Sequence, residues 1–110
     1  MPPLICQIKE NSWLARLTAW RLGAENMAVT IGSTIYLYKA TRKEFIANRK
    51  WVCHEICHVL QFRKYGIVRF LFLYSWETLR HGYRRNKFEI AALAAEDDEG
   101  PPAPLKFRDC

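Results

Sequence analysis

The feature that most constrains this chain is a pair of histidines four residues apart, His54 and His58, with Glu55 directly after the first. Residues at this spacing on an α-helix lie one turn apart and about 40° apart in projection. Two imidazoles placed in this way can bind one metal ion, and the adjacent carboxylate can take a proton from water on that ion. The pattern His-Glu-x-x-His therefore predicts a helix that carries a metal site.

The surrounding sequence predicts a mainly helical α+β domain with this motif on its central helix. That helix is expected to run from about Lys43 to Lys64, because Gly66 suits the position just beyond a helix end. Periodicity and capping residues predict three further helices, over residues 12–22, 68–81 and 87–96. Residues rich in β-branched and aromatic side chains predict an antiparallel hairpin with strands at 27–31 and 34–38.

A length of 110 residues fits one domain. We expect that domain to span residues 1–96, and we expect residues 97–110, which contain three prolines, to be a flexible polar tail. The four cysteines are too irregularly spaced for a disulfide scaffold, and the start of the chain lacks the features of a signal peptide. Reduced thiols and a cytoplasmic location are the resulting expectation.

The formal net charge of +6 would favour acidic partners, nucleic acid or anionic lipid, but a merely solvated basic face is the favoured interpretation. No nucleic-acid-binding motif accompanies the charge. The most apolar run, Ile67 to Trp76, is too short to span a bilayer and contains Arg69. The sequence thus argues against a membrane span but leaves a role at a membrane surface open.

A catalytic zinc site needs a third protein ligand besides the two histidines. Glu89 is the favoured candidate, because the alanines after it would let its helix approach another backbone closely. It competes with a local role, since Asn86 and Glu89 have capping-box spacing. His81 is the other candidate ligand.

The stretches HEICHVLQFRKYG, from His54, and LFLYSWETLRHGYRRNKFEIAA, from Leu71, resemble a group of small bacterial zincin-like domains similar to gluzincin metallopeptidases. Shared features are Gln61 three residues after His58, the Gly82-Tyr83 pair, and the Asn-x-Phe-Glu stretch that ends at Glu89. The resemblance covers roughly residues 25–95. It implies Zn²⁺ held by His54, His58 and Glu89, with Glu55 as general base.

The chain departs from that group in two places: Lys87 stands where a proline is frequent, and Ala91 where a second acidic residue is frequent. The loss of the acidic residue would remove a partner that orients a histidine. Tyr83 is a candidate hydrogen-bond donor to an oxyanion, with loop packing as its alternative role. Cys57 is expected to be a small buried residue rather than a ligand.

These observations favour a zinc-dependent metallopeptidase in which Glu55 moves the proton. Residues 34–38 are expected to form the edge strand along which a peptide substrate adds. The second hypothesis is a zinc-binding structural or interaction module without catalysis and with a basic surface. The third is a basic adaptor for nucleic acid or acidic partners, carried by Arg80, Arg84, Arg85 and Lys87.

Overall fold

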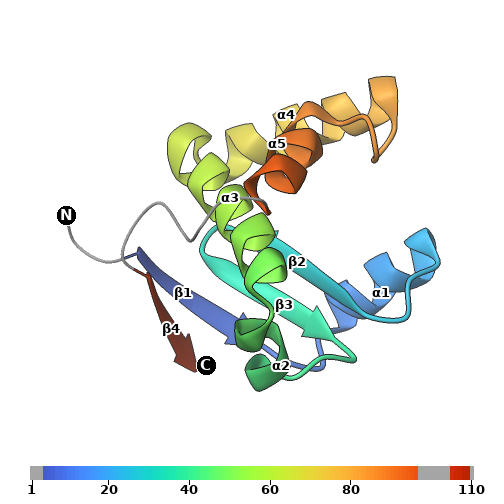
Figure 1. Ribbon diagram of the computed structural model, residues 1–110. Helices are drawn as coiled ribbons and strands as arrows, with labels where there is room; N and C mark the ends of the chain where they lie inside the picture. The colour runs from blue at the N-terminus through green and yellow to red at the C-terminus, as the bar shows by residue number, and fades with distance from the viewer. Residues whose placement is uncertain (1–3, 97–104, 110) are drawn as a thin grey trace.

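The computed structural model describes residues 4–96 and 105–109, which form four strands and five helices (Figure 1). The strands are β1 (Leu4–Lys9), β2 (Met27–Ile31), β3 (Thr34–Tyr38) and β4 (Leu105–Asp109). The helices are α1 (Trp13–Leu22), α2 (Arg42–Ala47), α3 (Arg49–Tyr65), α4 (Ile67–His81) and α5 (Lys87–Ala95). The predicted α+β class is confirmed. Among these helices, none has the length and apolar character needed to cross a bilayer.

The four strands form one sheet in the order β2-β3-β1-β4. Strands β2 and β3 are the predicted antiparallel hairpin, with Met27 opposite Tyr38 and Ile31 opposite Thr34. Gly32 makes their tight turn at a positive φ of 65°, which a glycine adopts without strain. Because β3 pairs with β2 on one side and β1 on the other, the prediction that residues 34–38 are an edge strand is wrong. Among the described strands, the edges of the sheet are β2 and β4.

Strands β1 and β4 were not predicted, and both pair in parallel: β1 with β3 and with β4. Residues 105–109 therefore form a strand inside the segment expected to be a flexible tail. Leu105 and Phe107 alternate with Lys106 and Arg108 in the sequence, which is the period of a strand. The rest of that expected tail, residues 97–104 and 110, lies outside the described residues.

The helix expected from Lys43 to Lys64 is two helices, α2 and α3, separated at Asn48. The backbone of Asn48 is extended, and its side-chain oxygen accepts a hydrogen bond of 3.1 Å from the Trp51 N–H. Asparagine competes with helix continuation in this way, because its side chain satisfies an amide at the start of a new helix.

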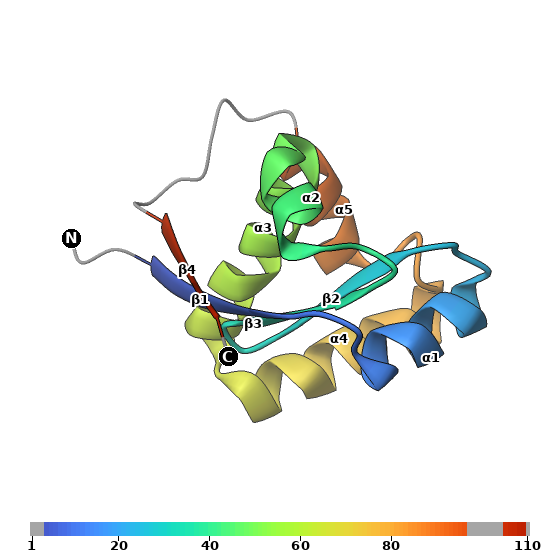
Figure 2. The same cartoon turned by 90° about the horizontal axis from the view of Figure 1, so that it is seen from below.

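The main core lies between the sheet and the helices α2 and α3. Its buried residues are Cys6, Ile8, Ile35, Leu37, Phe45, Val52, Ile56 and Val59. Helix α1 buries the small residues Ala15 and Ala19, and Figure 2 shows it below the sheet, on the side opposite α2 and α5. A second cluster of Phe62, Phe70 and Phe88 joins α3, α4 and α5 beyond β2. This second core holds α5 against the face of α3 that carries the histidines.

Candidate metal centre and its cavity

Three of the predicted site residues come together where α5 packs on α3. His54 Nε2 lies 3.1 Å from one carboxylate oxygen of Glu89, and His58 Nε2 lies 3.1 Å from the other. The ligand atoms of His54, His58 and Glu89 all lie within 4.8 Å of one another. His58 and Glu89 are buried and His54 is partly buried.

These donors suit a small divalent metal ion. Zinc bonds to nitrogen and oxygen at about 2.0–2.2 Å, so donors in a tetrahedral site lie roughly 3.3 Å apart. The two nitrogen-to-oxygen separations of 3.1 Å, one to each oxygen of Glu89, lie near that spacing, and the limit of 4.8 Å for the whole group is wider than it. A set of two imidazoles and one carboxylate leaves a fourth position, which is the arrangement of catalytic rather than structural zinc sites.

The second nitrogen of each histidine has a partner that orients the ring. His58 Nδ1 lies 2.9 Å from Gln61 Oε1, and the Gln61 amide nitrogen donates to the Phe88 carbonyl at 3.2 Å. His54 Nδ1 lies 2.8 Å from the carboxylate of Glu96. Because both partner oxygens accept, each Nδ1 carries a hydrogen. In the protonated histidines Nε2 carries one as well and donates it to Glu89, and loss of that proton frees the lone pair that a metal ion would take.

Asn86 sets the position of Glu89. Its side chain is fully buried, accepts from the Phe88 N–H at 2.8 Å, and donates to the Tyr74 carbonyl at 3.1 Å and the Thr78 hydroxyl at 2.9 Å. These bonds cap α5 and attach its first turn to α4. The backbone N–H of Asn86 donates to the Tyr83 carbonyl, so Glu89 does not close a capping box.

The carboxylate of Glu89 instead receives hydrogen bonds from both histidines and from the Tyr74 hydroxyl. Burial alone would raise its pKa, but the hydrogen bonds from His54 and His58 outweigh burial and hold the pKa far below its usual range. Burial likewise opposes charge on the histidines. The hydrogen bonds to Glu89 and the negative charge of Glu55 outweigh it and raise the pKa of His54 to about 9 and that of His58 in the same direction.

Glu55 is buried beside the two histidines and does not belong to the ligand group. The Thr30 hydroxyl on β2 donates to its Oε1 at 2.7 Å, which fixes the carboxylate between α3 and the sheet edge. Burial raises the pKa of Glu55 above its ordinary value, although positive charge on His58 and His54 opposes the shift. A carboxylate with a raised pKa is a stronger base than an exposed one.

The other predicted residues divide into those near the centre and those away from it. Tyr83 lies beside Glu89, and burial together with the charge of that carboxylate raises the pKa of Tyr83, so its hydroxyl stays protonated. His81 is exposed at the end of α4 and is not in the ligand group. Cys57 also lies outside that group, but it is only partly buried rather than buried as expected, and its sulfur accepts from the Gln61 amide at 3.6 Å.

Three contributors to the centre are not predicted from the sequence: Thr30, Tyr74 and Glu96. Phe70, Tyr74 and Thr78 are spaced four residues apart on α4 and so lie on one helix face. A helical wheel would therefore have placed the two polar side chains on the same face as buried Phe70. Glu96 lies 42 residues from His54, and nothing local in the sequence pairs them. It occupies the orienting role that the alanine at position 91 had been expected to leave empty.

A cavity of about 710 Å³ opens beside the ligand group. Its polar lining includes His54, Glu55, His58, Tyr83 and Glu89, and the edge strand β2 contributes all five of its residues to the wall. The rest of the lining is mainly apolar and comes from α1, α3 and α4: Leu17, Leu22, Phe62, Phe70 and Leu71. Its size is that of a typical small-ligand site.

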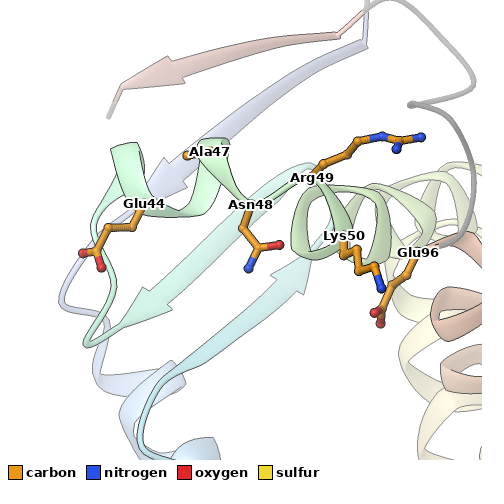
Figure 3. A pocket seen from close by; sticks show the side chains of 6 residues that line it. All are labelled: Glu44, Ala47, Asn48, Arg49, Lys50 and Glu96. Atoms are coloured by element: carbon orange, nitrogen blue, oxygen red, sulfur yellow. The ribbon is translucent and has the colours of Figure 1, made fainter.

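A second hollow lies over the break between α2 and α3 and is open to solvent (Figure 3). Its wall consists of Glu44, Ala47, Asn48, Arg49, Lys50 and Glu96. Glu96 therefore reaches His54 from the solvent side, whereas Glu89 reaches it from the buried side. Among the described residues, the one group that could hold a metal ion is His54, His58 and Glu89. The hollow therefore has no such group of its own.

Comparisons with family models, with curated proteins and with solved structures find no match for the chain.

Proposed function

We propose that this protein is a zinc-dependent hydrolase that cleaves peptide bonds, with His54, His58 and Glu89 as ligands. The observation that carries the proposal is the convergence of these three side chains on one point at the polar end of a cavity. Its donor set, two imidazoles and a carboxylate from a second helix, is the one implied by the resemblance to gluzincin-type zincin-like domains.

Bound zinc would polarise the scissile carbonyl and lower the pKa of a water molecule. Glu55 would accept a proton from such a water molecule and pass it to the leaving amine. Its buried position, the Thr30 hydrogen bond and its raised pKa suit both transfers. The protonated hydroxyl of Tyr83 donates to the developing oxyanion from the wall of the same cavity.

Strand β2 supports the choice of an extended peptide as substrate. It is the outermost strand on one side of the sheet, none of the described strands pairs with its outer edge, and it lines the cavity along its whole length. An extended peptide can add to such an edge through main-chain hydrogen bonds. The apolar lining then accepts large hydrophobic side chains of that peptide.

Glu55→Gln tests the catalytic part of the proposal. The variant keeps the shape of the side chain but cannot take a proton, so we expect unchanged zinc content and a loss of about 10²–10⁴-fold in rate. The assay is mass spectrometry of new termini in a peptide library, with the exposed Glu44→Gln as matched control. Equal cleavage by wild type and Glu55→Gln would refute the role of Glu55.

The non-catalytic alternative predicts a different pair of results. If the ion contributes mainly folding energy, removal of zinc by a chelator unfolds the domain, and the zinc-loaded wild type cleaves nothing in the library. If the ion is catalytic, the chelated protein keeps its circular dichroism spectrum and loses cleavage, which returns when zinc is added. These outcomes separate the two functions without any variant.

A further inference from the structure

Helix α1 directs its largest side chains away from the protein. Trp13 and Trp20 are 76% and 77% exposed, and Leu17 between them is also exposed. Their spacing of four and three residues puts all three on one helix face. The opposite face is buried through the small side chains of Ala15 and Ala19. The apolar stripe on α1 is therefore not part of either core.

Helix α4 repeats this arrangement. Val68 and Leu79 are 83% and 80% exposed, and Phe72 and Trp76 are exposed with them. Phe70 is the buried residue of this helix. Exposed apolar side chains are ordinary when scattered, but two helices that each line up three or more of them mark an interaction surface.

Arginines flank both stripes. Arg16 and Arg21 are exposed on α1, and Arg69 and Arg80 are exposed on α4. Helix α1 contains no acidic residue, and the single acidic residue of α4, Glu77, accepts a hydrogen bond from the Lys87 N–H. The Arg80 guanidinium lies 5.8 Å from the centre of the Trp76 ring. Tryptophan and aliphatic stripes bordered by cations are typical of helices that lie in a membrane interface.

The two helices also lie on one side of the molecule. Figure 2 shows α1 and α4 below the sheet, with α2 and α5 above it. Both helices contribute walls to the cavity beside the candidate metal centre, α1 through Leu17 and Leu22 and α4 through Phe70 and Leu71. The exposed stripes and their arginines are hereafter called the α1/α4 face.

We propose that the α1/α4 face binds the surface of an anionic lipid bilayer. The aromatic and aliphatic side chains enter the headgroup region, and the four arginines pair with lipid phosphates and carboxylates. A second copy of the chain fits this face poorly, because symmetric contact would bring arginines against arginines. Nucleic acid fits poorly as well, since Val68 and Leu79 gain nothing from a phosphodiester backbone.

The test is flotation of the full chain with vesicles of phosphatidylcholine, alone or with about a third phosphatidylserine. We expect binding to the anionic vesicles that weakens with salt, and quenching of tryptophan fluorescence by brominated lipid. Trp20→Glu with Phe72→Glu should abolish binding. Arg16→Gln with Arg80→Gln should weaken it by about fivefold for each arginine. Because no turnover is measured, the result is independent of the proposed hydrolase activity.

Two control variants lie on the other side of the sheet. Leu93→Glu changes an exposed apolar residue of α5, and Lys43→Gln changes an exposed cation of α2, so both should bind as wild type does. The proposal would be overturned if the variant with Trp20→Glu and Phe72→Glu still bound vesicles, or if brominated lipid did not quench the wild type. It would also be overturned if duplex DNA bound the protein as well as anionic vesicles do and displaced it from them. So would a dimer in sedimentation that Trp20→Glu converts to monomer.

Discussion

Glu96 provides the sharpest test of how the candidate metal centre is organised. Its carboxylate lies 2.8 Å from His54 Nδ1, on the side of the ring away from Glu89. It thereby holds the ring in the orientation in which Nε2 would face a metal ion bound by the proposed ligands. Glu96→Gln keeps an acceptor oxygen but removes the negative charge, whereas Glu96→Ala removes both.

The expected losses follow from this contact. Changing the partner of a metal-bound histidine typically lowers metal affinity by about 10–100-fold, or roughly 1.4–2.7 kcal/mol. The Glu96 side chain is 25% exposed, so water screens part of its charge. We therefore expect about a tenfold loss of zinc affinity for Glu96→Gln and a loss approaching a hundredfold for Glu96→Ala.

The assay is competition for zinc against a chromophoric chelator at fixed pH. Glu44→Ala is the matched control, because Glu44 lines the same open hollow as Glu96 but belongs to α2 (Figure 3). It should leave zinc affinity unchanged. If the zinc affinity of Glu96→Ala is within twofold of the wild-type value, the orientation of His54 does not depend on Glu96, and the proposed role of Glu96 is wrong.

Two further predictions concern protons and packing. The pKa of His54 is raised to about 9 in the metal-free protein, so zinc binding at pH 7.5 should release protons, and zinc affinity should increase as the pH rises towards 9. Calorimetry in buffers of different ionisation enthalpy measures the number of protons released. A number near zero would contradict this prediction. Asn86→Ala removes three hydrogen bonds from a fully buried side chain and should destabilise the fold by about 3 kcal/mol in urea unfolding. A change below about 1 kcal/mol would show that Asn86 does not attach α5 to α4.

The helices and the hairpin were predictable because their signals are local. Ser12 caps the start of α1 and Gly23 caps its end, as expected. Asn86 caps the start of α5, also as expected. The spacing of His54 and His58 needs only helical geometry to place them on one face. Glu89 was chosen from the alanines that follow it and from the resemblance, and α5 does bring its carboxylate to both histidines.

What the sequence did not reveal depends on contacts between distant segments. Strand β1 becomes recognisable only through its parallel partners β3 and β4, neither of which is adjacent in the sequence. Thr30 and Glu55 are 25 residues apart, and no local pattern links a strand hydroxyl to a helical carboxylate. The break at Asn48 was missed because a helix of suitable composition continues on both sides of it.

Zinc stoichiometry decides whether His54, His58 and Glu89 hold a metal ion. Protein stripped of metal, dialysed against zinc and analysed by mass spectrometry of the element should hold one zinc per chain in the wild type. His58→Ala and Glu89→Ala should each lose it, because each removes one of the three proposed ligands. A wild type without tightly bound zinc, or a Glu89→Ala variant that holds it as tightly as wild type, would contradict the account.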